Sequence, residues 1–525
     1  MRRYLLVTLL AGLPVLTFGC ATRSPMPETA QIREPILPPA LLPANTQPAV
    51  LPVVAEIPVV RPKLGGNLTV DEVLASVTQS FPLLLSIQEE RGIAAADRLT
   101  AEGAFDLQLR SNFTSQEGSF GNRRFDVVAE QPLAYSGASV FGGYRLGQGD
   151  FAVYNGGQKT NNGGELRGGI QVPLLRDGPI DRRRATLRQA QIAQQLAEPA
   201  IKRALLDIQR NAARSYWSWV AAGEQYRIAR GLLKLAEDRQ EFFEGRLKAG
   251  NEDVIRVDDN RRSIFDRRGR LRSTERLVQQ SALELSLYLR DDAGLPVVPT
   301  AAQLPAGFFD AKPIAVNPDQ KEADVALALA QRPEVERFEL LKQRVAVDLK
   351  LALNQFNPAL NVGAGFSQDL GDGKKSFTGT GIFESDATSA TAFVTFEMPW
   401  QRREAQGRAR KAMLQMNQLL QQERFARDSI RTEVLDSFSN LTLTADRLEQ
   451  ARLELNEADK VAENEKKRVI VGGRDVVDLN LRELNAAEAQ SKVANTLAEF
   501  YRAYADYLAA TGRSGGNPPP AAPVK

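Results

Sequence analysis

The second half of this chain repeats the first half at a fixed spacing, and the repeat is helical. The segment around Gly250 aligns with the segment around Gly472, and the same offset of 222 residues carries Tyr216 onto Phe438. After each glycine, apolar residues recur every seven positions, which is the period of a helix packed against another helix. These positions are Val257, Ile264, Leu271, Val278 and Leu285 in the first half and Leu479, Ala486, Val493, Phe500 and Tyr507 in the second. The pattern predicts two copies of a long helical hairpin.

The longest helices are predicted over about residues 178–248 and about residues 402–470. Each would extend for roughly 105 Å at 1.5 Å per residue, which is far more than a compact domain needs. A glycine turn at residues 250–251 or 472–473 then reverses the chain, and a return helix follows to about residue 290 or 510. Hairpins of this length are typical of an assembly rather than of a catalytic pocket.

Ahead of each long helix, the period at which apolar residues recur changes from 3.6 to 2 residues. Apolar and polar residues mostly alternate over residues 105–113 and 166–172, and the second half keeps the same phase between residues 356 and 399. Such alternation predicts strands with one apolar and one polar face. Their length is close to the ~9–11 residues that cross a bilayer at a tilt. Short β segments near residues 125–130 and 139–146 would lengthen the first hairpin.

Four strands in one chain cannot close a membrane barrel, and an open sheet edge in lipid leaves backbone groups without partners. The chain is therefore expected to share its sheet with copies of itself. Three copies would give a closed barrel of twelve strands, continued by a ring of helical hairpins around a lumen. The predicted fold class is mainly α, with two helix–strand–strand–helix repeats, an α-barrel and four strands per protomer of a trimeric 12-stranded β-barrel.

The N-terminus has the composition of an export signal. Two arginines precede an apolar run over residues 5–16, which is too short to span a bilayer. Gly19-Cys20 follows and resembles a bacterial lipobox, in which signal peptidase cleaves before a cysteine that is then lipidated. We predict a signal peptide over residues 1–19 and lipidation of Cys20. The alternative is an ordinary signal peptide with a chance cysteine.

Composition also marks the remaining boundaries. Residues 20–66 are rich in proline and are expected to form an extended tether to the lipidated cysteine. The first repeat is expected over residues 67–290 and the second over residues 319–511. An irregular linker over residues 291–318 would separate them, and a disordered tail would follow over residues 512–525.

The residue types that are missing exclude most chemistry. The chain has no histidine and Cys20 is its only cysteine, so it can form neither an internal disulfide nor a Cys/His zinc site. The usual general base of nucleophilic catalysis is absent as well. The 67 basic and 64 acidic residues nearly cancel, so no overall field indicates a nucleic-acid partner. We expect neither enzymatic activity nor a bound metal or cofactor.

The chain resembles TolC-type outer membrane factors over about residues 67–511. The resemblance rests on the order of helices and strands and on a set of motifs: Leu68-Thr69-Val70-Asp71-Glu72-Val73-Leu74, Val172-Pro173-Leu174-Leu175, Ala213-Arg214-Ser215-Tyr216-Trp217 and the two Arg-x-x-x-Gly turns. It implies a homotrimeric channel with a β-barrel in the outer membrane of a Gram-negative bacterium and an α-helical barrel in the periplasm. It also implies two partners, a periplasmic adaptor and an inner-membrane efflux pump, with the pump supplying the energy for export through a passive conduit.

The same resemblance assigns the periplasmic entrance to the second helical tip. Asp478 matches the acidic residue that narrows the entrance, and Arg474 lies where it would tie a closed tip together. Three Asp478 carboxylates near a threefold axis would attract cations and repel anions. The alternative is that Asp478 is a solvated surface aspartate.

Both helical tips are candidates for contact with the adaptor. They comprise Gly250, Asn251, Glu252 and Asp253 in the first repeat and Gly472, Gly473 and Asp475 in the second. The alternative role is structural, since glycine permits a left-handed turn and aspartate caps the following helix. The two roles are compatible with each other.

Two other classes of protein fit the sequence less well. A periplasmic coiled-coil adaptor or scaffold lipoprotein without a pore would need one hairpin and a globular β domain, in place of two strand pairs with matched phase. A carboxylate-dependent cell-wall hydrolase would need a concave catalytic domain, and no segment of the sequence indicates one.

Overall fold

The computed structural model describes residues 66–291, 293–311, 313, 317–372, 388–470 and 476–513. The chain divides into two units, Met1–Pro58 and Val59–Lys525, and all of the described residues lie in the second. The predicted signal peptide, the lipidation site Cys20 and nearly all of the predicted tether lie outside the described residues. So does the predicted tail from residue 514 onward.

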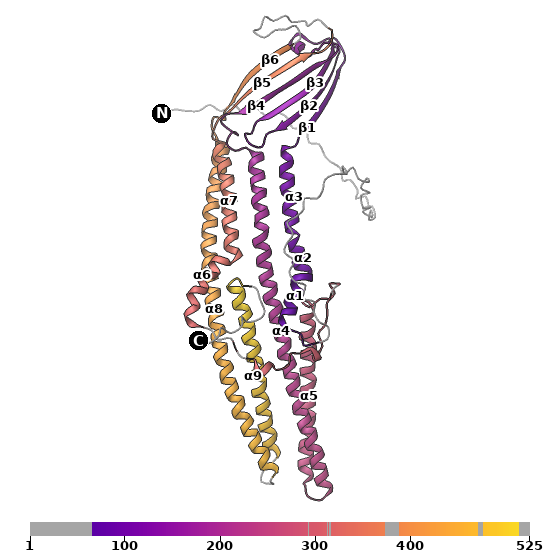
Figure 1. Ribbon diagram of the computed structural model, residues 1–525, viewed down its shortest axis with the longest axis vertical. Coiled ribbons are helices and arrows are strands. Elements are labelled where there is room, and N and C mark those ends of the chain that lie inside the picture. Colours follow the sequence, from indigo (N-terminus) through magenta and orange to yellow (C-terminus); the bar gives the residue numbers. More distant parts are fainter. Residues whose placement is uncertain are drawn as a thin grey trace, which may run out of the picture. The chain divides into compact units, whose positions relative to one another are not determined.

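The order helix, strands, long helical hairpin occurs twice along the chain (Figure 1). The first half contributes α1 (Val70–Ser80), α2 (Pro82–Gln88), α3 (Glu90–Glu102), β1 (Gln108–Gln116), β2 (Asn122–Pro132), β3 (Ser139–Gly149), β4 (Glu165–Pro173), α4 (Arg182–Lys248) and α5 (Val254–Ser286). The second half contributes α6 (Lys321–Gln331), α7 (Pro333–Asn354), β5 (Ala359–Asp369), β6 (Thr388–Glu397), α8 (Arg403–Ile470) and α9 (Val476–Ala510). The predicted long helical hairpins are thereby confirmed, as α4–α5 and α8–α9.

Side-chain caps explain where two of these helices begin. Thr69 and Glu72 form a capping box at the start of α1, in which the Thr69 N–H donates to the Glu72 carboxylate at 2.9 Å. At the start of α4, the Asp181 carboxylate accepts a hydrogen bond from the Arg184 backbone N–H at 2.8 Å. Both caps satisfy backbone donors that have no partner within the first turn of a helix.

The heptad positions form the buried seam of each hairpin. Eight of the ten positions are buried: Val257, Ile264, Val278, Leu285, Leu479, Val493, Phe500 and Tyr507. Leu271 and Ala486 are half-buried. The seven-residue period therefore reports the packing of α5 on α4 and of α9 on α8, as expected for knobs-into-holes contacts between helices.

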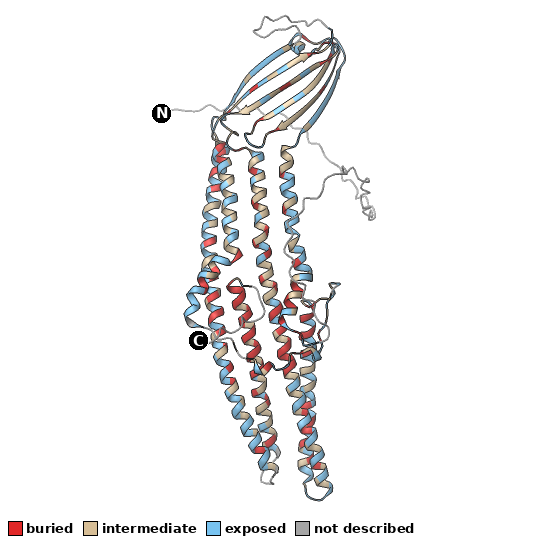
Figure 2. Cartoon of the chain, in the orientation of Figure 1, coloured by how far each residue is buried: buried red, intermediate tan, exposed pale blue. Residues whose placement is uncertain are grey.

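The main core lies where the two hairpins and α1 meet, and buried residues gather there in Figure 2. Trp219 of α4 and Phe500 of α9 are completely buried. Trp217 stacks on Tyr501 with 4.1 Å between ring centroids. The Tyr216 hydroxyl donates to the Leu68 carbonyl at 2.8 Å, which fixes the entry into α1.

The strands form one antiparallel sheet of six strands in the order β1 to β6. The expected count of four strands is therefore corrected to six. The segments near residues 125–130 and 139–146 are full strands, β2 and β3, of 11 residues each, and they pair with each other and with β1 and β4. The alternation in β3 is weak because Gly142 takes an apolar position between Val140 and Tyr144, so periodicity alone underestimates this strand.

All four junctions between the sheet and the helices lie at the same end of the strands. β1 and β5 begin after α3 and α7, whereas β4 and β6 end before α4 and α8. Because neighbouring strands run in opposite directions, the starts of β1 and β5 lie beside the ends of β4 and β6. The sheet is thus joined to four helices at one end of its strands, and the loop between β3 and β4 lies at the other end (Figure 1).

Within the part of the chain that the structure describes, no single helix combines the length and apolarity needed to cross a bilayer. The segments Val70–Ser80 and Pro82–Phe105, which are bent by 46° relative to each other, meet these criteria only as a pair.

Replacing Gly223 with alanine tests how tightly α4 packs on the linker between the repeats. A Cβ atom at this position would collide with the side chain of Leu304, which is 2% exposed and has little room to move. We expect Gly223→Ala to lower the thermal midpoint of unfolding, since overpacking a core costs about 1–3 kcal/mol. The shift is measured by scanning calorimetry of the purified protein.

Gly245→Ala is the matched control in the same helix. Apart from its chain neighbours and the adjacent helical backbone, no heavy atom among the described residues lies within 4 Å of a Cβ built at Gly245. Alanine is favoured over glycine in a helix interior by about 0.5–1 kcal/mol. The control should therefore raise the thermal midpoint slightly. A larger loss of stability for the control than for Gly223→Ala would contradict the packing described here.

Candidate functional site

One face of the sheet is apolar across all six strands. The register places aliphatic and aromatic side chains opposite one another, because directly paired residues share a face. Along this face lie Leu109 and Phe113 of β1, Phe125 and Val127 of β2, Val140 and Leu146 of β3, Leu166 and Ile170 of β4, Val362 and Phe366 of β5, and Val394 and Phe396 of β6. Phe113 is 64% exposed and Val394 is 67% exposed. An exposed apolar face of this breadth is suited to contact with lipid.

The opposite face is polar and carries a cluster of charges centred on Asp126, which is 7% exposed. Arg124 Nε lies 2.7 Å and Arg145 Nε 2.8 Å from the Asp126 carboxylate, and Arg167 Nη2 lies 3.1 Å from it. Arg145 also lies 3.7 Å from Glu165. Three guanidinium groups therefore share two carboxylates, so the cluster keeps an excess of positive charge on the polar face.

This charge cluster is not evident from the sequence. Its members belong to three different strands, and only the register of β2 with β3 and of β3 with β4 brings them together. The single signal in the sequence is that Arg145 and Arg167 fall on the polar phase of their strands. The phase of the apolar–polar alternation determines which face of the sheet a residue lies on. It does not determine which charged residues lie beside it on that face.

A second group of charges joins the two helical hairpins near their tips. Arg267 of α5 is 3% exposed, and its guanidinium donates to the Glu483 carboxylate of α9 at 3.0 Å and to the Leu232 carbonyl at 2.7 Å. Arg239 of α4 forms an ion pair with the same carboxylate and donates to Asn480 at 2.5 Å. Burial lowers the pKa of Arg239, and Glu483 opposes that effect. Glu483 thus connects the first hairpin to the second.

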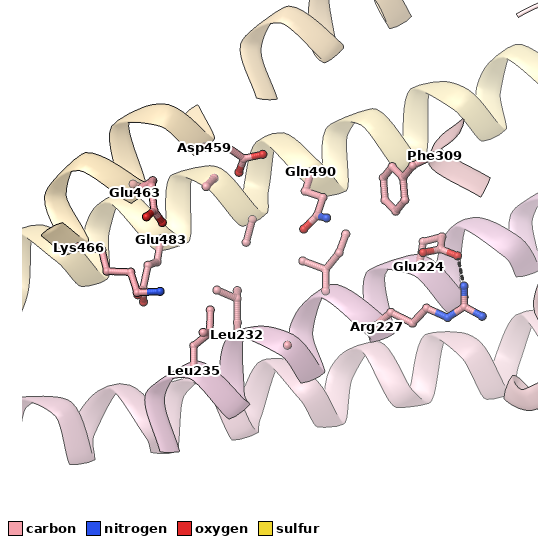
Figure 3. Close-up of a pocket in the computed structure, with 15 residues that line it drawn as sticks. Glu224, Arg227, Leu232, Leu235, Phe309, Asp459, Glu463, Lys466, Glu483 and Gln490 are labelled. Carbon is pink, nitrogen blue, oxygen red and sulfur yellow. Dashed lines mark hydrogen bonds and ion pairs between the residues drawn. The ribbon is translucent and has the colours of Figure 1, made fainter. Parts of the chain in front are cut away.

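A groove of about 690 Å³ lies between α4 on one side and α8 and α9 on the other (Figure 3). Figure 3 shows Glu224 and Arg227 of α4 at one end of the groove and Glu463 and Lys466 of α8 toward the other end, with Asp459 between them. Apolar residues of α4, among them Leu232 and Leu235, complete this side of the wall. The groove therefore has charged ends and an apolar side, which suits an amphipathic segment of a partner protein.

Two acidic groups in this groove are held in unusual environments. Burial raises the pKa of Glu224, although Arg227 Nη1 lies 2.5 Å away and opposes the rise. Partial desolvation also raises the pKa of Asp459, although this residue is exposed to solvent. Carboxylates that become charged at the cost of desolvation favour a cationic partner, because a cation in contact with them would offset that cost.

The first helical tip is structurally defined by its glycine. Gly250 has φ +72°, in the left-handed region, and the Asn251 N–H donates to the Arg246 carbonyl at 2.9 Å. The Asp253 carboxylate accepts from the Ile255 N–H at 3.1 Å and caps α5. Glu252 lies 3.5 Å from Arg246 and 3.2 Å from Arg256, so its side chain is 5% exposed. These residues have the structural roles that the sequence allows, and contact with an adaptor stays a prediction.

The second tip is described only in part. Gly472, Gly473, Arg474 and Asp475 lie outside the described residues, so their roles stay predictions. Asp478 lies half-buried in the first turn of α9, where the helix dipole favours a carboxylate. It precedes Glu483 by five residues on the same helix.

A two-faced antiparallel sheet continued by long helical hairpins is an architecture that this chain shares with solved outer membrane channels. Residues 170–289 match the outer membrane efflux protein family. The predicted resemblance to TolC-type outer membrane factors is thereby confirmed, and so is the predicted combination of long helical hairpins with antiparallel strands, with six strands in the chain in place of four.

Individual known proteins agree with this classification. The chain is 26% identical over 236 residues to the probable outer membrane lipoprotein SilC of Salmonella typhimurium, which is 44% of this chain and 49% of SilC. The alignment thus spans about half the length of that relative. The structure of CusC gives a TM-score of 0.59 at 14% identity, over 85% of this chain and 92% of CusC. The open state of the MtrE channel of Neisseria gonorrhoeae gives 0.58 at 14% identity, over 85% and 89%. At these identities the two structures establish the fold alone.

The buried carboxylate of Glu224 makes stability depend on pH. Because burial raises its pKa, the folded state keeps this proton to higher pH than the unfolded chain does. The contribution of Glu224 to the free energy of unfolding is fully present below the pKa of the unfolded chain, about 4.3. It is lost as the pH rises through the pKa of the folded state. We expect Glu224→Gln to raise the thermal midpoint relative to the parent at pH of about 8, and the difference to shrink toward pH of about 4.

Glu244→Gln is a control of opposite sign in the same helix. The pKa of Glu244 is lowered, chiefly by the hydrogen bond that Gln240 donates at 2.8 Å. Its replacement should therefore lose stability relative to the parent as the pH rises. Equal pH dependence of the two variants in scanning calorimetry would show that burial of Glu224 has no energetic effect.

Proposed function

We propose that this chain is the outer membrane channel of a tripartite export system, assembled as a homotrimer. The observation that carries the proposal is the sheet with one exposed apolar face and one charged polar face. In a closed barrel the apolar face would contact lipid and the polar face would line a water-filled lumen. The long hairpins α4–α5 and α8–α9 would continue this passage into the periplasm.

Transport through such a channel is passive, and its energy comes from the partners. We propose a periplasmic adaptor and an inner-membrane efflux pump as these partners, in line with the class to which the similar proteins belong. The groove between α4, α8 and α9, together with the tips at Gly250–Asp253 and Gly472–Asp475, is the proposed adaptor surface. Cys20 is the proposed site of a lipid anchor in the outer membrane.

The alternative of a periplasmic scaffold or adaptor lipoprotein without a pore has less support. A scaffold of helical hairpins needs only the heptad seams, whereas a sheet of six strands with an exposed apolar face has no use in water. The apolar face is therefore the feature that favours a channel over a scaffold.

Conductance in planar bilayers tests the function, with Asp478→Ala beside the parent. We expect large unitary conductance from both proteins and a weaker cation preference for Asp478→Ala, since a carboxylate ring at the entrance attracts cations. Asp446→Ala, which removes an exposed aspartate of α8, is the control and should keep the parent's selectivity. Absence of conductance from all three would argue against a channel. Unchanged selectivity in Asp478→Ala would remove Asp478 from the entrance.

Glu483→Gln tests whether the link between the hairpins holds the periplasmic end closed. The substitution leaves the buried Arg267 and its neighbour Arg239 without their carboxylate. Hydrogen bonds to charged groups contribute about 1.5–3 kcal/mol, and about 1.4 kcal/mol changes an equilibrium tenfold. We therefore expect the ratio of open to closed time in bilayer recordings to rise by roughly tenfold or more.

The control for this prediction is Glu488→Gln on the same helix. Glu488 has a side chain 66% exposed and lies 3.9 Å from Arg270, so its ion pair contributes little. This variant should gate like the parent. If both variants gate alike, the link through Glu483 does not control opening.

A further inference from the structure

The two outer strands of the sheet have long edges that nothing described covers. Within the described residues β1 pairs only with β2, and β6 pairs only with β5. Every residue of β1 from Leu109 to Gln116 is exposed, as are eight of the ten residues of β6. Each edge therefore offers a row of backbone N–H and C=O groups along nine or ten residues. Such an edge pairs readily with another strand.

The two edge strands lack most of the residue types that prevent pairing with another strand. Soluble proteins protect exposed edges with proline, lysine or inward-pointing charges. β1 carries a single charged residue, Arg110, and β6 carries only Glu397 at its end. In lipid, each unpaired backbone group on such an edge would have no hydrogen-bonding partner, which is strongly unfavourable. Both edges therefore require a strand partner.

A second copy of this chain fits both edges. A sheet with an even number of strands has its first and last strands in opposite directions, so a copy related by rotation places its β1 antiparallel to β6. The faces match as well: Ala392, Val394 and Phe396 of β6 would continue into Leu109 and Phe113 of β1 on the apolar side. The alternation of the whole sheet is then kept across the junction.

We propose that β6 of each copy pairs with β1 of the next, and that three copies close into a barrel of eighteen strands. The copy number rests on the trimer proposed above, and the six strands per copy come from the sheet itself. Barrel diameter grows roughly in proportion to strand number, so the wall would be about 1.5 times as wide as that of a twelve-stranded barrel. A barrel of this size encloses an aqueous channel.

The additional width comes from the hairpin β2–β3, which also brings most of the charge cluster. Arg124, Asp126 and Arg145 lie on this hairpin, so three copies would place three such clusters around the lumen. The hairpin begins and ends at the end of the strands that lies away from the helices, where the Asp150 N–H donates to the Gly121 carbonyl at 2.9 Å. It therefore widens the barrel without changing the strands that connect to the helices.

Disulfide cross-linking between copies tests the junction. Asn112→Cys on the polar face of β1 is combined in turn with Thr391→Cys, Phe393→Cys and Thr395→Cys on the polar face of β6. The full-length protein is oxidised in membranes and separated on a denaturing gel. We expect at least one pair to give covalent dimers and trimers, with the trimer as the largest product. Each single cysteine variant is a control and should give neither.

A second control uses the other face of β6. Asn112→Cys combined with Ala392→Cys places the two thiols on opposite faces, so it should not cross-link. Products that end at the dimer would show two copies and twelve strands, and a link within one chain would show that β1 and β6 close on each other. A conducting trimer that forms no β1–β6 link would overturn the junction and leave the proposed channel function intact.

Deletion of residues 122–149 tests the strand count independently. The deletion joins Gly121 to Asp150, which are already in contact, and leaves β1 beside β4 in antiparallel direction. We expect the variant to assemble with a barrel circumference about two-thirds of the parent's in electron microscopic top views. An unchanged circumference, or a parent barrel of twelve strands, would show that β2 and β3 are not part of the wall.

Discussion

Backbone hydrogen bonding at the edges of the sheet is the constraint on which the rest of the structure depends. Helices satisfy their own N–H and C=O groups, whereas a strand needs a neighbour on each side. Among the described residues, each of the four inner strands has a paired strand on both sides, whereas β1 and β6 have a paired strand on one side only. A bilayer offers no donor or acceptor to such edges. In the membrane location proposed for this chain, the sheet would therefore be incomplete until β1 and β6 paired with further strands.

The helical part obeys a different rule, since burial of apolar seams is enough to hold it. Trp219, Leu285 and Phe500 are completely buried within the single chain, where the two hairpins meet α1. Toward the tips the apolar seam thins to small clusters such as Phe243 with Val257. There the two hairpins are connected by the ion pairs of Arg239 and Arg267 with Glu483. Ion pairs can exchange partners while the packed core stays intact, which would suit the opening that we propose for this end.

The nearly balanced charge of the whole chain does not reveal how charge is distributed in the folded protein. The total of 67 basic and 64 acidic residues suggests no strong electrostatic feature. The fold nevertheless gathers three arginines around Asp126 on the polar face of the sheet, and it places Glu224 and Asp459 in the groove between helices. One field is positive and lies on the polar face of the sheet, and the other is acidic and lies in the groove. Their separation is a property of the tertiary structure, because net charge carries no information about position.

The sequence by itself determined the helical hairpins, the phase of most strands and the turn at Gly250, because heptad period, alternation and glycine are local signals. It underestimated the sheet, since Gly142 interrupts the alternation of β3. It did not identify Arg267 with Glu483 or the Asp126 cluster, whose members are far apart in the chain. Those pairings depend on strand register and on the packing of α9 against α4 and α5. Only the tertiary structure decides them, because a periodic pattern fixes which face a residue takes and leaves open which residue it meets there.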